Sequence, residues 1–187
     1  MHIVFGGAFN PPTLAHQKIV TKLLDIYKNA SILILPVGDD YLKSELVSFN
    51  HREQMLKLMF SNEEKVNILN LEQLRPYQGT LKSLNELSKT YHDIHFVVGA
   101  DNLQYFESWI NYKDLLKSYP FIIIARDIGP KKDKIEQMFS HLEHDFTWIE
   151  YNEQISSSQF RNNPDQCSSF LPPQVCQYIK KNKLYEV

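Results

Sequence analysis

The sequence predicts an α/β fold, a Rossmann-like parallel sheet with helices on both faces, in one domain spanning residues 1–187. Short, almost wholly apolar runs such as Ser31–Leu35 and Phe121–Ala125 are typical of strands buried on both faces. Segments with apolar residues near helical spacing separate these runs. Strands that alternate with helices in this way favour parallel pairing. Polar and glycine-rich stretches directly follow the strands, which is where such sheets bind their ligands.

The first third of the chain contains two predicted strands and two predicted helices. His2–Phe5 is a strand that ends at a pair of glycines, and Ser31–Leu35 is the second strand. Between them, Thr13–Lys28 carries apolar residues near helical spacing. After a long polar loop, Asn50 and Glu53 have the spacing of a capping box, which predicts a helix to about residue 60.

The same alternation continues to the end of the chain. Further strands are predicted at Val66–Leu69, Ile94–Val98, Phe121–Ala125 and Phe146–Ile149. Further helices are predicted at Leu81–Lys89, Asn102–Leu116, Asp133–His141 and Gln174–Lys181. Because ligands lie beyond the carboxyl ends of parallel strands, the loops of interest are 6–13, 36–49, 70–80, 99–109 and 150–161.

Composition excludes several classes of protein. The formal net charge is −2, with 43% hydrophobic and 22% charged residues, so no nucleic-acid or membrane-surface partner is expected. No apolar stretch approaches the roughly 20 residues that span a bilayer, and the N-terminus does not resemble a signal peptide. We therefore expect a cytoplasmic protein. In that compartment Cys167 and Cys176 are expected to be reduced structural thiols.

The first chemistry-bearing cluster runs from Gly6 to His16. Two glycines after a strand let the backbone approach a ligand closely. Thr13 and His16 lie three residues apart in the first turn of the predicted helix, where free amides and the helix dipole favour an anion. A hydroxyl and an imidazole there suit the charge that develops in phosphoryl transfer. The alternative is a tight turn whose histidine packs against the sheet; neither G-x-G-x-x-G nor a G-K-S/T loop is present.

Two further clusters follow later strands. Ser156, Ser157 and Ser158 can cap a helix and offer hydroxyls and amides to phosphate oxygens, with Arg161 on the same face. Taken alone, this pattern also fits an ordinary serine cap near an arginine. The segment from Gly99 to Trp109 begins with Gly99 and Asp101 at a predicted strand end. The alternative interpretation is that Asp101 caps a helix and Trp109 packs in the core, with no ligand involved.

Together the three clusters resemble the nucleotidylyltransferase superfamily. Residues 6–16 resemble its signature G-G-x-F-x-P-x-H/T-x-G-H, with Ala15 where glycine is commonest. Residues 155–161 resemble its second motif, I-S-S-T-x-I/L-R. Residues 99–109 resemble the G-x-D-x7-W of nicotinate mononucleotide adenylyltransferases, in which the tryptophan stacks on the pyridine ring and the next amide meets the carboxylate.

The resemblance implies transfer of AMP from ATP to nicotinate mononucleotide, giving nicotinate adenine dinucleotide and pyrophosphate. It implies Mg²⁺ bound through the ATP phosphates and no metal site of the protein's own. The implied catalytic residues are His16 and Thr13. The implied ATP-binding residues are Gly6, Gly7, Phe9, His16, Lys43, Gly99, Asp101, Ser156, Ser157, Ser158 and Arg161. The implied acceptor-binding residues are Lys43, Arg52, Thr80, Trp109 and Ile110.

Alternatives stay open at this point. Lys43 and Arg52 also fit solvated surface charges. Where the family shows S-Y-T-x-D/Q-T-L, residues 76–81 read P-Y-Q-G-T-L, one residue shorter. The acceptor could then be nicotinamide mononucleotide, pantetheine phosphate or a sugar-alcohol phosphate, or the chain could be a nucleotide-binding regulator without turnover. An oligomer is possible. The histidine pairs 92/95 and 141/144 are interpreted as surface or packing residues.

Overall fold

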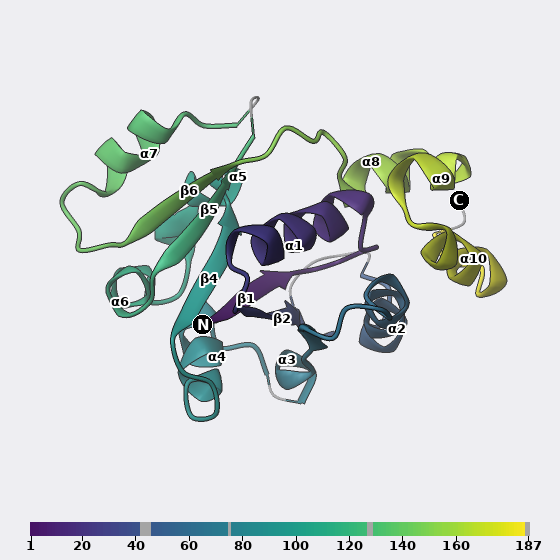
Figure 1. Ribbon diagram of the computed structural model, residues 1–187, viewed down its shortest axis with the longest axis horizontal. Helices are drawn as coiled ribbons and strands as arrows, with labels where there is room; N and C mark the ends of the chain where they lie inside the picture. The colour runs from purple at the N-terminus through teal and green to yellow at the C-terminus, as the bar shows by residue number, and fades with distance from the viewer. Residues whose placement is uncertain (42–45, 75, 127–128, 186–187) are drawn as a thin grey trace.

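The structure is a computed structural model that describes residues 1–41, 46–74, 76–126 and 129–185. Within these ranges six strands form one sheet in the order β3-β2-β1-β4-β5-β6, and every neighbouring pair is parallel (Figure 1). The strands are β1 (His2–Gly7), β2 (Ser31–Pro36), β3 (Val66–Ile68), β4 (Ile94–Gly99), β5 (Phe121–Ala125) and β6 (Phe146–Glu150). The predicted parallel sheet is confirmed, and its order is the one typical of Rossmann folds.

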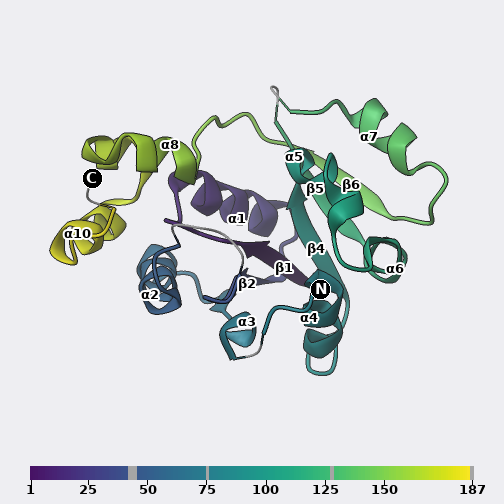
Figure 2. The same ribbon diagram turned by 180° about the vertical axis from the view of Figure 1, so that it is seen from behind.

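Side chains that alternate along the strands divide the core into two layers. Ile3 and Phe5 of β1 pack on one face of the sheet, and Val4 packs on the other. The first layer is covered by α1, α2 and the C-terminal helices, and the second by α4 to α7. Figures 1 and 2 show α1 and α4 on opposite sides of the sheet. Burial on both faces explains why the strands are almost wholly apolar.

The helices follow the strands in the predicted alternation. They are α1 (Leu14–Ile26), α2 (Phe49–Met59), α3 (Leu71–Leu74), α4 (Thr80–Leu87), α5 (Ala100–Leu103), α6 (Tyr112–Ser118), α7 (Lys132–Phe139), α8 (Ser157–Asn162), α9 (Cys167–Phe170) and α10 (Pro173–Lys181), with 3₁₀ turns η1 (Phe106–Ser108) and η2 (Pro164–Gln166). Over the part of the chain that is described, none of them is both long and apolar enough to cross a membrane.

Two predicted helices differ from the structure. The single helix expected over 102–116 is broken into α5, η1 and α6, because Trp109 is extended and Asn111 adopts a left-handed conformation with φ of 55°. The capping box of Asn50 and Glu53 is wrong. Helix α2 begins at Phe49 with Ser48 as its N-cap residue, two residues before the predicted cap. The carboxylate of Asp39, from the loop after β2, accepts a hydrogen bond of 2.6 Å from the backbone N–H of Phe49.

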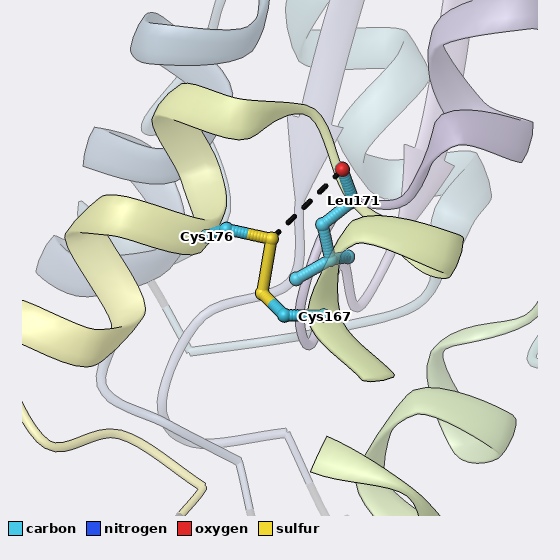
Figure 3. Close-up of a disulfide and its surroundings, with 3 residues drawn as sticks. All are labelled: Cys167, Leu171 and Cys176. Atoms are coloured by element: carbon cyan, nitrogen blue, oxygen red, sulfur yellow. Dashed lines mark hydrogen bonds between the residues drawn. A yellow bond between two sulfur atoms is a disulfide. The ribbon is translucent and has the colours of Figure 1, made fainter. Parts of the chain in front are cut away.

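The two cysteines form a disulfide, so the prediction of reduced thiols is wrong (Figure 3). Cys167 begins α9 and Cys176 lies in α10. The turn between these helices brings the two Cα atoms to 5.8 Å, within the range that a disulfide requires. Both side chains are buried, and the bond ties the two helices together.

We expect reduction of this disulfide to destabilise the protein by about 2–3 kcal/mol, because a bond between residues nine apart removes loop-closure entropy from the unfolded chain. Urea unfolding with and without a dithiol reductant measures the loss, and mass spectrometry after alkylation counts free thiols. A C167S/C176S double variant is the control, since reductant should not change its unfolding. Two free thiols in the untreated protein would contradict the bond.

Candidate active site

A cavity of about 320 Å³ opens at the carboxyl ends of β1 and β4, where the strand order reverses. This is the position at which doubly wound sheets bind nucleotides. Seven of the predicted site residues line it: Gly6, Gly7, His16, Thr80, Gly99, Asp101 and Trp109. The first and third clusters singled out by the sequence, together with Thr80, therefore line one cavity.

The glycine pair gives the floor of the cavity its shape. A Cβ atom on Gly6 would lie 3.2 Å from the ring of Phe96, and one on Gly7 would lie 3.2 Å from the ring of Phe9. Both distances are shorter than most Cβ contacts in proteins, so a side chain at either position would require the neighbouring ring to shift. Phe9 itself is buried beneath the loop and does not line the cavity. Phe9, a predicted ATP-binding residue, therefore supports the loop from below in this structure.

His16, in the first turn of α1, is held as a hydrogen-bond donor. Its Nδ1 accepts a hydrogen bond of 2.9 Å from the backbone N–H of Thr13. A neutral ring that accepts at Nδ1 carries its proton on Nε2. Burial, and then the positive charge of Arg126, lower the pKa of His16 to about 4. The imidazole is therefore neutral near pH 7 and has an N–H to offer to a ligand in the cavity that it lines.

Thr13, the other residue predicted to be catalytic, does not line the cavity and contacts His16 instead. Its side chain has 0% exposure, and its hydroxyl lies 2.8 Å from Nδ1 of His16. As the N-cap residue of α1 it sits below the ring that faces the cavity. The structure gives Thr13 the role of orienting His16.

The serine cluster begins a helix, as predicted, and packs on the first cluster. Ser156 caps α8 by accepting from the N–H of Gln159, and the hydroxyl of Ser157 donates to the carbonyl oxygen of Pro11 at 2.8 Å. Arg161 donates to the carbonyl oxygen of Asn10 at 2.7 Å and to the hydroxyl of Ser158 at 3.2 Å. The two motifs are thus in direct contact. None of Ser156, Ser157, Ser158 and Arg161 lines the 320 Å³ cavity.

The third cluster contributes Gly99, Asp101 and Trp109 to the cavity wall. Asp101 lies in the first turn of α5, which begins directly after β4. The indole of Trp109 packs against Phe106, with ring centroids 4.7 Å apart, and edge-on against Phe96 at 6.4 Å. These two phenylalanines fix the orientation of an aromatic side chain at the edge of the cavity.

The neighbouring residue Ile110 connects this cluster to the segment before α4. A Cβ atom on Gly79 would lie 2.9 Å from Cβ of Ile110, and Gly79 has φ of 97°, so a glycine is required there. Ile110 itself is 51% exposed and does not line the cavity with its side chain. Thr80 and Ile110, two of the implied acceptor-binding residues, therefore belong to segments that are in contact with each other.

Arg52 does not line the cavity, and its predicted contact with the acceptor stays a prediction. The side chain has 0% exposure. Its guanidinium donates to the carbonyl oxygens of Val47 (2.8 Å), Val37 (2.7 Å) and Ala8 (3.1 Å), and it pairs with Asp39 at 3.2 Å. Four acceptors from the loops after β1 and β2 converge on a charge that cannot reach solvent. Lys43, the other predicted cation, lies outside the described residues.

Sequence reasoning missed Arg126 and Tyr77, both of which line the cavity. Among the described lining residues Arg126 is the one lysine or arginine, and it is close enough to His16 to lower the pKa of that ring. The available signal was its position directly after the apolar strand β5, at the same sheet edge as Gly6 and Gly99. The hydroxyl of Tyr77 lies 3.3 Å from that of Thr80.

In the described ranges no three residues of the types His, Cys, Asp and Glu are grouped as a metal site. His95 instead contacts Asp93 at 3.1 Å, and His144 contacts Glu136 at 3.2 Å.

Comparison with known proteins gives concordant results. The family model described as cytidylyltransferase-like matches residues 4–163. A protein of Acholeplasma laidlawii, named as a probable nicotinate-nucleotide adenylyltransferase, is 40% identical over 100% of this chain and 98% of its own length. A protein of Sulfurimonas denitrificans with the same name is 30% identical over 86% of this chain and 83% of its own length.

Solved structures agree in fold. Two structures of a Plasmodium falciparum nicotinic acid mononucleotide adenylyltransferase, one complexed with APC and one with NaAD, superpose with TM-scores of 0.80 and 0.81. Each is 24% identical, and the match covers 98% of this chain and 96% of the other.

Proposed function

The chain belongs to the cytidylyltransferase-like family, within the nicotinate-nucleotide adenylyltransferases, and on this basis we propose that it transfers AMP from ATP to nicotinate mononucleotide. The products are nicotinate adenine dinucleotide and pyrophosphate, a step of NAD biosynthesis. The observation that carries the proposal is the 40% identity with an adenylyltransferase over the whole chain. The position of His16 in the cavity at the strand-order reversal supports it independently.

The reaction is a direct displacement at phosphorus. A phosphate oxygen of the acceptor forms a bond to the α-phosphorus of ATP, the bond from that phosphorus to the bridging oxygen breaks, and pyrophosphate leaves with the electron pair. No residue is needed as a nucleophile. The protein's contribution is to position the two substrates and to stabilise negative charge.

His16 and Arg126 are suited to that contribution. The neutral imidazole offers its Nε2–H to an oxygen on the α-phosphate, and it keeps that proton throughout. A donor that is already oriented costs no reorganisation during the reaction, which is the basis of oxyanion-type stabilisation. Arg126 adds a full positive charge to the same cavity. For the β- and γ-phosphates, the free amides at the start of α8, Ser158 and Arg161 are the proposed partners.

Mg²⁺ is proposed to arrive with ATP, bound through its phosphates, and to neutralise part of their charge. Two carboxylates of the described residues line the cavity; that of Glu72 accepts a hydrogen bond from Ser83, and that of Asp101 is the one proposed to contact the ion or its water shell. ATP and a pyridine mononucleotide are the proposed partners. The expectations of a cytoplasmic location, of no nucleic-acid partner and of a possible oligomer stay predictions.

The pyridine ring of the acceptor is proposed to lie against Trp109. A flat aromatic face suits a cationic, electron-poor ring through stacking and cation–π attraction. The contact between Gly79 and Ile110 supports recognition of the ring substituent by backbone amides of these two segments. Thr80, which lines the cavity beside Tyr77, is the proposed hydroxyl contact on this side.

We expect Trp109→Ala to raise the KM for nicotinate mononucleotide about tenfold or more, because stacking on an aromatic side chain contributes about 1–3 kcal/mol per base. The KM for ATP should change less than about twofold. Trp148→Phe is the matched control, since the indole of Trp148 donates to Glu136 outside the cavity. Equal increases in both KM values for Trp109→Ala would reject the stacking role.

Pyrophosphate release with ATP and a panel of acceptors tests the proposed function. The panel contains nicotinate mononucleotide, nicotinamide mononucleotide, pantetheine phosphate and a sugar-alcohol phosphate. Nicotinate mononucleotide should give the highest kcat/KM by more than tenfold. A higher value for another acceptor would reassign the substrate, and release with none of them would indicate a nucleotide-binding protein without turnover.

A further inference from the structure

Tyr185, which lies beyond α10, reaches the segment that precedes His16. Its hydroxyl donates a hydrogen bond of 2.8 Å to Oδ1 of Asn10. Asn10 is only 3% exposed and lies between the glycine pair and the start of α1. The same Oδ1 also accepts from the backbone N–H of Val47 at 3.1 Å, which connects it to the loop before α2.

The C-terminal part of the chain holds this segment through three separate donors. Besides Tyr185, Arg161 donates to the carbonyl oxygen of Asn10 and Ser157 donates to that of Pro11. The ring of Tyr185 packs edge-on against Phe160 of α8, with centroids 5.6 Å apart. Phe160 is adjacent to Arg161, so the tyrosine and the arginine are placed by the same helix. The segment from α8 to Tyr185 thus contacts the loop between the glycine pair and α1.

We infer that Tyr185 is a positioning residue for the adenylyl transfer: through Asn10 it holds the segment between the glycine pair and His16 in the conformation that receives ATP. This rests on the proposed function for what the site binds. The hydroxyl of Tyr185 donates to Asn10, and neither residue lines the cavity, so the effect of Tyr185 on the site passes through Asn10. Burial raises the pKa of Tyr185, so the hydroxyl keeps its proton and stays a donor at neutral pH.

The physical reason for an effect on the reaction is geometric. His16 follows Asn10 by six residues, and its donor must meet an α-phosphate oxygen at hydrogen-bond distance. A displacement of about 1 Å in a catalytic group can cost a large factor in rate. Asn10 accepts hydrogen bonds from Val47, from Arg161 of α8 and from Tyr185, and together these restrict its position. Loss of one of them leaves the chain folded but widens the range of positions open to the loop.

Tyr185→Phe removes only the hydroxyl, and we expect it to lower kcat/KM for ATP about fivefold to tenfold and to weaken ATP binding, measured by calorimetry, by a similar factor. Tyr178→Phe is the matched control. Its hydroxyl lies 2.8 Å from Nδ1 of His51 on α2, so this variant also loses one hydrogen bond between the C-terminal segment and the rest of the molecule. It should lose comparable thermal stability and keep both ATP constants within about twofold of wild type.

A double-variant cycle separates action through Asn10 from a general loss of stability. In an Asn10→Ala background, Tyr185→Phe should have no further effect on kcat/KM, whereas in Asn10→Asp, which keeps an acceptor, its effect should persist. The inference is overturned if Tyr185→Phe matches Tyr178→Phe in both ATP constants. It is also overturned if its penalty is undiminished in Asn10→Ala. If Asn10→Ala does not fold, the Asn10→Asp background decides, and the inference is overturned if Tyr185→Phe lowers kcat/KM there no more than Tyr178→Phe does. A wild-type protein without turnover would contradict the proposed function. The present inference could still be tested in that case, because calorimetry measures the effect of Tyr185→Phe on ATP binding directly.

Discussion

Replacing His16 with alanine is expected to lower kcat by about 10²–10³, the cost typical of removing one preorganised donor from developing negative charge. The KM for ATP should change much less, because the hydrogen bond strengthens in the transition state. The structure supplies the reason for this expectation: the backbone N–H of Thr13 occupies Nδ1, so the remaining N–H is directed elsewhere. Steady-state kinetics with saturating acceptor measures the effect.

The control is His141→Ala, an exposed histidine beyond the end of α7, which should keep wild-type kinetics. Wild-type turnover in His16→Ala would remove this residue from the mechanism. A smaller loss in His16→Gln, which retains an N–H donor, would indicate that donation rather than shape carries the effect.

The pH dependence follows from the same ring. Because the folded-state pKa of His16 is lowered to about 4 from its ordinary 6.5, the ring stays neutral through the range in which exposed histidines titrate. Activity should therefore show no loss near pH 6.5 that depends on His16. The folded state binds fewer protons than the unfolded chain between about pH 4 and 6.5, so this group's contribution to stability is complete above 6.5 and declines as pH falls towards 4. An acid limb near 6.5 that vanishes in His16→Gln would contradict the neutral donor.

Arg52→Met is expected to destabilise the fold by about 3–5 kcal/mol, because it removes the shared partner of several buried oxygens. Methionine keeps most of the length of the side chain and loses all of its donors. The guanidinium holds Ala8, Val37, Val47 and Asp39 together, so the loops after β1 and β2 lose their common contact. Urea unfolding followed by circular dichroism measures the change.

Lys57→Met is the matched control on the same helix. Its ammonium forms an exposed pair with Glu53 at 2.9 Å, and such pairs contribute about 0–1 kcal/mol. If Arg52→Met instead unfolds like wild type and raises the KM for the acceptor, Arg52 binds substrate, as the sequence resemblance implied, and the structural role assigned here is wrong.

The fold could be predicted because its signals are local. Ser31–Leu35 and Phe121–Ala125 are apolar at every or nearly every position, which only burial on both faces explains, and both are strands in the structure. The break in the helix predicted over 102–116 had no comparable signal. It depends on a left-handed Asn111 and on the packing of Trp109 against Phe106, a contact that forms only in the folded protein.

The cavity could be predicted in part for a related reason. Gly6, Gly99 and His16 follow strands directly or begin the next helix, so their position relative to the sheet edge follows from the topology. The role of Arg52 depends on two loops meeting around it, and the contact of Tyr185 with Asn10 spans almost the whole chain. Pairing of Cys167 with Cys176 likewise depends on the turn between two short helices. Neither spacing nor composition carries such information.

The central claim is that the acceptor attacks the α-phosphorus of ATP directly, over a pocket that stabilises charge and supplies no nucleophile. The stereochemical course at phosphorus tests it most directly. The wild-type enzyme is incubated with nicotinate mononucleotide and one diastereomer of ATP that carries sulfur on the α-phosphorus, and the configuration of the dinucleotide product is determined by ³¹P NMR. A single displacement predicts inversion. Retention would require two displacements through a covalent enzyme intermediate and would contradict the account.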